Sequence, residues 1–571
     1  MHIQSLNIPI KICLILFTLS AATLAEENRL NRSAVNFTSS NLPIIVIDTH
    51  GQTIPTSNPR IIADMGVIDN GQGIRNQIND PFNNYEGKIS IEIRGSSSAG
   101  WLKKSYGLET QNDDGSNRNV VLLGMPAEND WILYAPYYDR SLIRNVLTFH
   151  LVNQMGWYAT RTRPCELVLN GDYQGVYVLM EKIKRDRNRV NIARLDPDKI
   201  SGDDLTGGYI IKIDKEPWKP GFDSRYPPQP SSGRKIRYQF HYPKGDEIVD
   251  EQKNYIRGFI DAYETTMYNY NHSNPAQSYG LYLNVESFVD NFIINELSRN
   301  VDGYRLSTFF HKDKDSKGGK LVAGPAWDFN FSFGNVGYYQ AERIEGWQLE
   351  YFLNDSYFHS VDGFQVPFWW RKLLNDTHFR ESIYHRWRQL RQSLLHPDSL
   401  YAYLDQLHAL LDEAQERNFE IWIGPGDPKA SGDGWFPPDY PIRHLKTYAD
   451  EINYLKQWMT SRMQWMDQEI NTFVSLGDDP SIMPTGLKIT RIYPNPFNAT
   501  TTIDFELGQA QQLQLRLSDI QGREIDLLLN RWVEAGAHTA VLHLPNLASG
   551  VYLLRIQGIN QIARSKIVLI K

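Results

Sequence analysis

Cysteine is almost absent from this 571-residue sequence, which contains only Cys13 and Cys165. We expect Cys13 to be removed with an N-terminal leader, so one cysteine remains and no disulfide can form within the mature chain. The fold must then be stabilised by its hydrophobic core, which a chain of this length can bury. Cys165 lies in the apolar segment CELVLN, which predicts a buried, unreactive thiol rather than a nucleophile.

Long apolar runs are also missing, apart from one at the N-terminus. Lys11 precedes the segment ICLILFTLSAATLA, and the small residues Thr23 and Ala25 are typical of a signal-peptidase site. This predicts a secretory signal peptide over residues 1–25, since the run is too short to remain as a membrane-spanning helix. We find no other stretch apolar enough to cross a bilayer, and we expect an exported protein without a transmembrane helix.

The sequence also lacks an excess of positive charge. The net charge is −7, with 22% charged and 41% hydrophobic residues. Such a chain has no long-range attraction for nucleic acid, which we do not expect as a partner. Aromatic residues make up 12% of the sequence, which favours well-packed layers and surfaces that stack rings or sugars.

Alternating apolar residues predict a strand-rich first half between residues 41 and 211. In the segment KISIEIRG, Glu92 and Arg94 alternate with isoleucines and therefore share one face of a strand. The segment CELVLNGDYQGVYVLMEKI predicts a hairpin with the loop NGDYQG. Between these strands we expect a helix that is capped by Asp139 and ended by Gly156.

From about residue 246 the apolar residues recur three and four apart, which predicts helices. The main body, residues 26–475, is therefore predicted to be α+β, with a strand-rich first half and a helical second half. A Pro- and Gly-containing linker at 476–488 separates it from the tail. Short alternating strands at 489–571 predict a small C-terminal β-sandwich.

Two aspartates follow predicted elements in the second half. Asp302 comes after a helix, and Asp328, within GPAWDFNFSFGN, follows a predicted hairpin made of STFFHK and KLVAG. Because a hairpin returns the chain on itself, we expect the two side chains to lie close together. Carboxylates so placed suit phosphoryl transfer, in which one accepts the acceptor hydroxyl's proton and another holds a divalent cation. The alternative is a pair of structural aspartates in turns or caps.

The pattern compares loosely with protein kinases, in which H-R-D-x-x-x-x-N is followed by D-F-G. Here N-V-D-x-x-x-x-S is followed by D-F-N, so Ser307 stands at the position of the second metal ligand and Asn330 is a candidate replacement. The sequence contains no G-x-G-x-x-G or Walker A loop. Arg94, Lys103 and Lys104 are candidate phosphate contacts, and the alternative for them is a solvated sheet edge.

Several segments together resemble the CotH kinase family, a group of atypical, secreted or spore-associated protein kinases named for a spore-coat protein. The segments are RGSSS followed by KKSYGLE, YVLMEKIKRDRNRV, GGYIIKIDK, NVDGYRLSTFF and GPAWDFNFSFGN. The resemblance covers about residues 42–467. It implies a divergent kinase-like fold that uses ATP and Mg²⁺ or Mn²⁺ to phosphorylate serine or threonine hydroxyls of a partner protein.

The resemblance also implies roles for individual residues. Asp302 corresponds to the catalytic aspartate and Asp328 to the metal-binding aspartate, with Asn330 beside it. Lys103 corresponds to a phosphate-contacting lysine. Glu181 is a candidate to orient that lysine, or else a surface glutamate at a strand end. The expected nucleotide-binding residues are therefore Arg94, Lys103, Lys104, Glu181 and Trp327.

Two departures from the family pattern support a second hypothesis. Many members carry Asp-x-Asp where this chain has Asp328-Phe329-Asn330, and an asparagine where it has Ser307. A neutral ligand holds magnesium less tightly. The alternative function is thus a weakly active or inactive kinase-like surface scaffold that binds a protein or glycan. A metal-dependent hydrolase is disfavoured, because the sequence has no evident His–carboxylate ligand cluster.

The tail has its own resemblance. YPNPFNATTTIDFEL, NLASGVYLLRI and the closing KIVLIK are similar to the type A sorting domain of type IX secretion, over about residues 489–571. This implies export across an outer membrane, with the type IX machinery as a partner and the cell surface or medium as the destination. The alternative is an ordinary sandwich domain that binds a partner or a carbohydrate.

Overall fold

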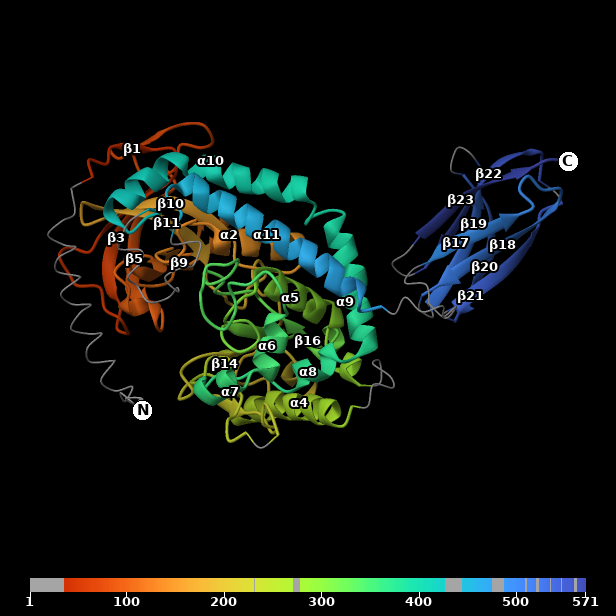
Figure 1. The fold of residues 1–571 in the computed structure, drawn as a ribbon, viewed down its shortest axis with the longest axis horizontal. Helices are drawn as coiled ribbons and strands as arrows, with labels where there is room; N and C mark the ends of the chain where they lie inside the picture. The colour runs from red at the N-terminus through yellow and green to blue at the C-terminus, as the bar shows by residue number, and fades with distance from the viewer. Residues whose placement is uncertain are drawn as a thin grey trace, which may run out of the picture. The chain divides into compact units, whose positions relative to one another are not determined.

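The computed structural model places strands early in the chain and long helices later, as predicted (Figure 1). Contacts divide the chain into two compact units, Met1–Val474 and Ser475–Lys571. The predicted signal peptide and most of the predicted linker lie outside the described residues. The structure describes residues 35–230, 232–270, 278–426, 444–474, 487–508, 511–519, 523–534, 536–545, 547–558 and 562–571.

Seven strands of the first unit close into a barrel, in the order β10-β11-β9-β6-β5-β3-β2. Neighbours run antiparallel except β10 and β2, which run parallel. The alternation in β5 buries Ile89 and Ile91 completely. The strands are β2 (Ile44–Asp48), β3 (Ile61–Ile68), β5 (Tyr85–Arg94), β6 (Ser105–Gln111), β9 (Asp130–Tyr134), β10 (Thr162–Leu169) and β11 (Asp172–Glu181).

The hairpin between β10 and β11 turns at Asn170 and Gly171, so the predicted six-residue loop was too long. Both residues have positive φ, 53° and 84°, as a two-residue hairpin turn requires. Cys165 on β10 is fully buried and its thiol lies 3.7 Å from the carbonyl oxygen of Tyr177. Burial raises the pKa of this thiol to about 12, in agreement with the predicted unreactive cysteine.

Helix α2 (Arg144–Gln154) ends just before Gly156, as predicted, but Asp139 is not its N-cap. The buried Asp139 carboxylate instead accepts hydrogen bonds from the backbone N–H of Arg144 at 2.8 Å and from its guanidinium at 2.6 Å. The same guanidinium bonds Glu451 of α11 (Tyr448–Asn471) at 3.0 Å. This buried network ties the start of α2 to the end of the unit.

A five-stranded antiparallel sheet follows the barrel, in the order β13-β14-β12-β15-β16. The strands β15 and β16 form the predicted hairpin, with Phe310 opposite Ala323. The buried helix α5 (Val285–Ser298) begins at the N-cap Asn284 and leads to Asp302. The other elements here are β12 (Tyr209–Ile213), β13 (Gly221–Asp223), β14 (Arg237–Tyr242), β15 (Thr308–Lys312), β16 (Leu321–Ala323) and α4 (Asp250–Tyr268).

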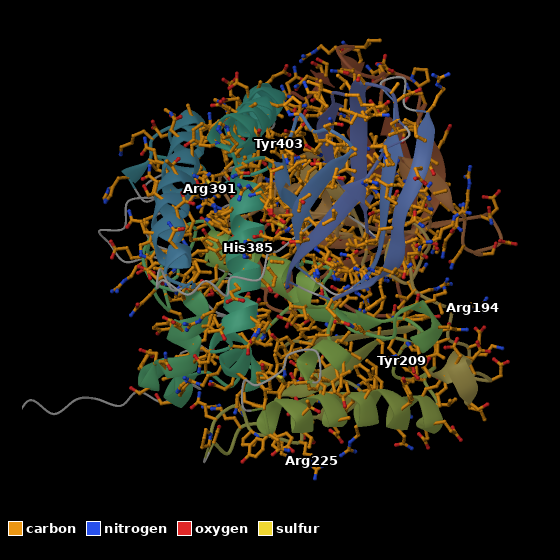
Figure 2. The ribbon with its side chains drawn as sticks, turned by 90° about the vertical axis from the view of Figure 1, so that its right-hand side faces the viewer. Arg194, Tyr209, Arg225, His385, Arg391 and Tyr403 are labelled. Atoms are coloured by element: carbon orange, nitrogen blue, oxygen red, sulfur yellow. The ribbon has the colours of Figure 1, made fainter. Side chains whose placement is uncertain are left out.

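Long helices complete the unit and contact one another through side chains labelled in Figure 2. Tyr403 of α10 stacks on His150 of α2, with ring centroids 3.7 Å apart. Arg391 of α9 bonds Asp467 of α11 at 3.0 Å. Within the described residues, no helix combines the length and hydrophobicity needed to span a membrane. The helices are α6 (Gln348–Asn354), α7 (Ser356–Val361), α8 (Trp369–Leu374), α9 (Thr377–Arg391) and α10 (Pro397–Ile421).

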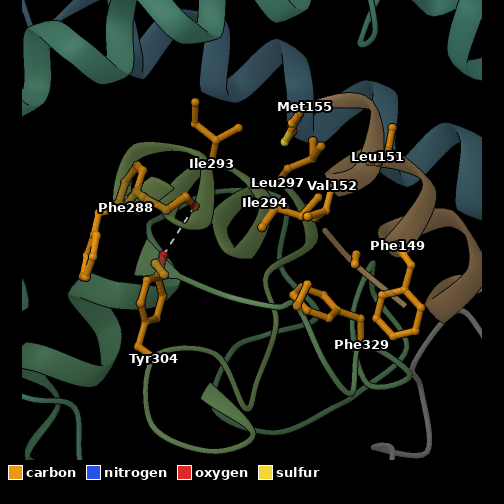
Figure 3. Close-up of a cluster of buried hydrophobic side chains, with 14 of the residues drawn as sticks. Phe149, Leu151, Val152, Met155, Phe288, Ile293, Ile294, Leu297, Tyr304 and Phe329 are labelled. Atoms are coloured by element: carbon orange, nitrogen blue, oxygen red, sulfur yellow. Dashed lines mark hydrogen bonds between the residues drawn. The ribbon is translucent and has the colours of Figure 1, made fainter. Parts of the chain in front are cut away.

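Part of the core of the first unit joins α2, α5 and the segment after β16. Figure 3 shows Phe149 of α2 beside Phe329, the residue that follows Asp328, with Ile294 and Leu297 of α5 nearby. All four of these apolar side chains are at most 2% exposed. The packing fixes the backbone that carries Asp328.

The second unit is a β-sandwich of two antiparallel sheets, β17-β18-β21 and β20-β19-β22-β23. Alternate residues of both sheets meet in one core, which includes Ile503, Phe505, Leu515 and Leu554. The sequence did not indicate β17 and β20. The strands are β17 (Lys488–Tyr493), β18 (Thr500–Leu507), β19 (Gln511–Ser518), β20 (Glu524–Val533), β21 (Gly536–His543), β22 (Gly550–Gln557) and β23 (Ile562–Leu569).

Candidate functional site

A cleft of about 450 Å³ is lined on one side by the barrel and on the other by β12 and the segments around Asp302 and Asp328. Because β15 leads away from Asp302 and β16 returns toward Asp328, the hairpin brings the two aspartates to the same cleft, as predicted. The cleft brings together six of the residues singled out in the sequence: Arg94, Asp302, Ser307, Trp327, Asp328 and Asn330.

Asp302 lies in the turn that follows α5. The helix ends at Arg299, whose left-handed φ of 44° redirects the chain. The carbonyl of Asp302 accepts from the N–H of Leu306 at 2.9 Å, and its carboxylate lies 3.5 Å from the guanidinium of Arg305. The residue is only 8% exposed, so its carboxylate is held in one place at the wall of the cleft.

Asp328 follows β16 on a backbone that is anchored on both sides. The residue itself has a φ of 64°, a strained value for a side chain with a Cβ. The next N–H, that of Phe329, donates to the side chain of Asn145 at 2.7 Å. Arg144 donates to the carbonyl of Ser332 at 3.1 Å. These bonds hold the aspartate at the cleft despite its strained conformation.

Burial, followed by the nearby carboxylates of Asp302 and Asp214, raises the pKa of Asp328 to about 6. Asp214 immediately follows β12 and was not singled out in the sequence. Its carboxylate accepts from the ammonium of Lys212 at 2.6 Å and from the N–H of Lys215 at 2.8 Å. Asp302 and Asp214 therefore both repel the charge of Asp328 within the cleft.

Arg94 and Trp327 form a pair inside the cleft. The guanidinium lies 5.4 Å from the centroid of the indole ring, within the range of a cation–π contact. Burial lowers the pKa of Arg94 to about 10, and the charge of Asp328 opposes this shift. Arg94 therefore stays charged at neutral pH and is placed to attract an anion.

Lys182 is a cleft cation that sequence reasoning missed. It follows β11 and shares a strand face with Met180, which also lines the cleft. Its ammonium bonds Asp130 of β9 at 2.9 Å. Lys184 bonds the same carboxylate at 2.8 Å but does not line the cleft. The signal that would have identified Lys182 is the alternation of β11 continued forward by one step, from Met180 to the residue just past the end of the strand.

The segment RGSSS forms a loop over the cleft, and Ser96, Ser97 and Ser98, here called the serine loop, line it. The loop begins at Gly95, whose φ of 115° is one that residues with a Cβ rarely adopt. Lys215 approaches it from the opposite wall, with its ammonium 3.5 Å from the hydroxyl of Ser97. The loop thus brings hydroxyl groups and a lysine to one end of the cleft.

Three predicted nucleotide contacts lie outside the cleft. Lys103 is 1% exposed and donates to the Val176 carbonyl at 2.6 Å and to the Asn418 side chain at 2.7 Å. Lys104 donates to the carbonyl of Ala99, the residue after the serine loop, at 2.8 Å. Their ammonium groups are occupied by protein oxygens and do not face the cleft.

The predicted pairing of Glu181 with Lys103 was wrong. Glu181 is fully buried and its carboxylate bonds Arg161 at 2.9 Å and the Tyr158 hydroxyl at 3.1 Å. Adjacent strand residues point to opposite faces, so Glu181 turns away from the face that Lys182 presents to the cleft.

The cleft offers oxygen donors of the kind that Mg²⁺ prefers, from Asp328, Asn330 and Asp302. Burial and then the repulsion by Asp302 and Asp214 raise the pKa of Asp328, and a divalent cation would relieve the repulsion. In the part of the chain that is described, no group of three His, Cys, Asp or Glu side chains is arranged to hold a metal. Magnesium commonly uses one or two carboxylates completed by phosphate and water, so these residues fit a cation that arrives with a nucleotide.

Comparison with known proteins follows the same division of the chain. Residues 91–466, more than half of the chain, match the family model described as CotH kinase protein. Residues 491–571 match the secretion system C-terminal sorting domain. No significant match to a curated protein exists.

Two solved structures show weak similarity. The proinflammatory kinase CtkA of Helicobacter pylori is 9% identical with a TM-score of 0.24, covering 64% of this chain and 94% of that chain. The alkylpurine DNA glycosylase AlkC of Pseudomonas fluorescens, bound to DNA, is 12% identical with a TM-score of 0.12, covering 39% and 64%. Such TM-scores do not support an argument about fold or function.

Proposed function

The chain belongs to the CotH kinase protein family, and on that basis we propose that it is an exported atypical kinase that transfers the γ-phosphoryl group of ATP to serine or threonine hydroxyls of a protein. The observation that carries the proposal is the placement of Asp302 and Asp328 in one cleft with Arg94 and Lys182. Paired carboxylates beside cations suit a reaction that deprotonates a hydroxyl and stabilises a polyphosphate.

Each residue has a distinct role in the proposed reaction. Asp302 accepts the proton of the acceptor hydroxyl while a bond forms between its oxygen and the γ-phosphorus. The bond from that phosphorus to the bridging oxygen of the β-phosphate breaks, and ADP leaves. Arg94 and Lys182 compensate the charge of the phosphates, and Trp327 flanks the nucleotide. Mg²⁺ or Mn²⁺, when bound by Asp328 with Asn330, neutralises further phosphate charge.

Transfer of radiolabel from ATP to a protein acceptor tests the proposal. The full chain should label a mixed protein substrate in the presence of Mg²⁺ or Mn²⁺, and Asp302→Ala should abolish labelling while nucleotide binding persists. Asp328→Asn should weaken metal-dependent nucleotide binding. If the folded wild-type chain binds no nucleotide and labels no protein, the proposed kinase activity is refuted. Labelling that survives both substitutions refutes the assigned roles.

Lys182 provides a sharper test because Lys184 is a matched control. Both lysines bond Asp130, but only Lys182 lines the cleft. Loss of a charge-assisted hydrogen bond costs about 2 kcal/mol, so Lys182→Met should weaken ATP binding about 30-fold. Lys184→Met should leave the affinity within about twofold of wild type. Isothermal titration calorimetry measures both, and equal effects would contradict the role of Lys182.

A second candidate function is a catalytically inactive kinase-like scaffold, and Asn330 is the observation that favours it. An amide stands where many family members have a second carboxylate, and a neutral donor weakens metal binding. If the chain is such a scaffold, we expect the folded protein to bind the nucleotide without transferring its phosphoryl group, or to bind no nucleotide at all. The labelling experiment above therefore separates the two functions.

The C-terminal sorting domain indicates export of the chain to the cell surface or the medium. We assign this export to the type IX secretion machinery, with the second unit as the segment that the machinery contacts. Deletion of residues 489–571 should leave the protein inside the cell, which fractionation and immunoblotting would detect. Surface exposure of the truncated chain would contradict the assignment.

A further inference from the structure

One buried carboxylate holds the lysine that sequence reasoning missed. Lys182 lines the cleft, and its ammonium lies 2.9 Å from the carboxylate of Asp130 on β9. Among the described residues, the ammonium bonds no other group. Asp130 is 6% exposed and does not line the cleft, so it cannot itself contact a bound nucleotide. An effect of Asp130 on a nucleotide must therefore act through Lys182 or through its charge at long range.

Strand register places Asp130 between a lysine and a second acid. Glu181, the last residue of β11, faces Trp131 of β9, so the next facing pair is Lys182 and Asp130. On the other side of β9, Asp130 faces Glu109 of β6. Like charges at facing positions destabilise a sheet. Burial, followed by the charge of Asp130, accordingly raises the pKa of Glu109. The barrel thus retains Asp130 despite an acidic neighbour, and its two lysine partners supply the compensating charge.

Lys184, the other lysine partner, does not depend on Asp130 alone. It bonds Asp130 at 2.8 Å, and it also bonds the carboxylate of Glu128 at 3.0 Å and the side-chain oxygen of Asn129 at 3.2 Å. If Asp130 were replaced, these two groups would still hold Lys184, whereas Lys182 would lose its bonded partner. Substitution of Asp130 therefore releases the lysine that lines the cleft and leaves the other in place.

The ion pair leaves Lys182 able to bind a ligand. A lysine ammonium carries three N–H donors, and Asp130 accepts from it through one oxygen. A free lysine side chain is flexible, and a ligand that binds it must oppose the loss of rotamer entropy. Because Asp130 already holds the ammonium in place, less entropy is lost when a ligand binds. The ion pair thus presents a fixed positive charge with unused donors to the cleft.

We propose that Asp130 is a positioning residue that fixes the Lys182 ammonium where it contacts the phosphates of the nucleotide. This inference rests on the proposed kinase function, in which ATP occupies the cleft. It also predicts the sign of an effect. If Asp130 acted only through its negative charge, its removal would strengthen the attraction of the cleft for a polyphosphate. If Asp130 positions Lys182, its removal weakens nucleotide binding.

Isothermal titration calorimetry of the full chain with ATP and Mg²⁺ tests this inference. Asp130→Asn nearly keeps the shape of the side chain and should weaken ATP binding about tenfold. In a Lys182→Met background the same substitution should change the affinity by less than about twofold, because no ammonium remains to be positioned. Glu128→Gln is the matched control, since it removes an acidic partner of Lys184 only, and its affinity should stay within about twofold of wild type.

A second variant tests position without a change of charge. Asp130→Glu retains an acid for both lysines but adds a methylene group, which moves the carboxylate and the ammonium that it holds. We expect ATP binding to weaken about threefold or more, with KM for ATP raised and kcat within about twofold of wild type. Thermal melting without nucleotide reports whether each variant is folded. Asp130→Glu keeps the buried charges paired and therefore replaces Asp130→Asn if the neutral variant does not fold.

The outcomes separate this inference from the proposed function. If wild type binds ATP but labels no protein, the kinase function is refuted, while the titrations still decide whether Asp130 positions Lys182. If wild type binds no ATP, both are refuted. Unchanged or tighter ATP binding by Asp130→Asn refutes the positioning role alone. An equal loss of affinity with and without the Lys182 ammonium refutes it as well, because Asp130 then acts independently of that lysine.

Discussion

Replacement of Asp328 by asparagine should stabilise the ligand-free protein while it removes the response to metal and nucleotide. Burial and the carboxylates of Asp302 and Asp214 raise the pKa of Asp328 from 3.8 to about 6. At neutral pH the folded protein therefore holds this carboxylate ionised against unfavourable interactions that the unfolded chain lacks. Asparagine has nearly the same shape and carries no charge, so it removes that cost.

The magnitude follows from the two pKa values. A shift from 3.8 to about 6 corresponds to about 3 kcal/mol when the group is fully shielded from solvent. Asp328 is partly exposed, so screening reduces the expected gain to about 1–2 kcal/mol. The folded state binds the proton more tightly than the unfolded state does. Proton binding by Asp328 therefore contributes stability that is fully present below pH 3.8 and is lost as the pH rises through about 6. Above that pH the ionised carboxylate destabilises the folded protein relative to the asparagine variant.

Urea unfolding and thermal melting of the full chain between pH 5 and 8 provide the assay. Asp328→Asn should unfold at higher urea than wild type at pH 8, and the difference should shrink toward pH 5. Addition of Mn²⁺ and ATP should raise the melting temperature of wild type but not of the variant. A variant that is less stable than wild type at pH 8, or that responds equally to Mn²⁺ and ATP, would refute the reasoning.

Three further predictions concern residues around the cleft. Lys103→Met should leave ATP affinity within about twofold of wild type, in contrast to Lys182→Met, because Lys103 lies outside the cleft; calorimetric titration of both variants checks this. Gly95→Ala should lower the free energy of unfolding by about 1–3 kcal/mol and weaken ATP binding, because the backbone φ of 115° at this residue is strained for a side chain with a Cβ. An alanine variant with the wild-type melting temperature and ATP affinity would contradict this prediction. Arg144→Ala should lower the free energy of unfolding in urea by about 3–5 kcal/mol, because it leaves the buried carboxylates of Asp139 and Glu451 without the guanidinium that both of them bond. An unchanged urea midpoint would refute this prediction.

Strand alternation predicted one wall of the cleft and missed another. Along β5, Glu92 and Arg94 were expected on one face, and both line the cleft. At the end of β11, the family resemblance drew attention to Glu181, while the cleft receives Met180 and Lys182 instead. A shift of one residue moves a side chain to the opposite face of a sheet. If the wrong set of alternate residues is chosen, every side chain of the strand is therefore assigned to the wrong face.

Local connectivity explains why the aspartate pair was predictable and Lys103 was not. Asp302 and Asp328 flank a hairpin, and short segments of sequence are enough to indicate a hairpin. The partner of Lys103 is Asn418, which is 315 residues away along the chain. No local pattern indicates that a distant helix covers a strand end. The burial of Lys103 therefore becomes visible only when α10 is placed against the barrel.

Asn330 has a physical explanation that does not require an inactive enzyme. The cleft already contains Asp214 in addition to the predicted pair, and its charge contributes to the raised pKa of Asp328. A further carboxylate at position 330 would raise that pKa again and hold Asp328 protonated, and so unable to bind a metal, over a wider pH range. The amide of Asn330 keeps an oxygen donor at the same place without adding charge. Asn330 therefore also fits an active kinase in which Asp328 stays ionised and able to bind a metal at neutral pH, and the labelling experiment separates this reading from the scaffold.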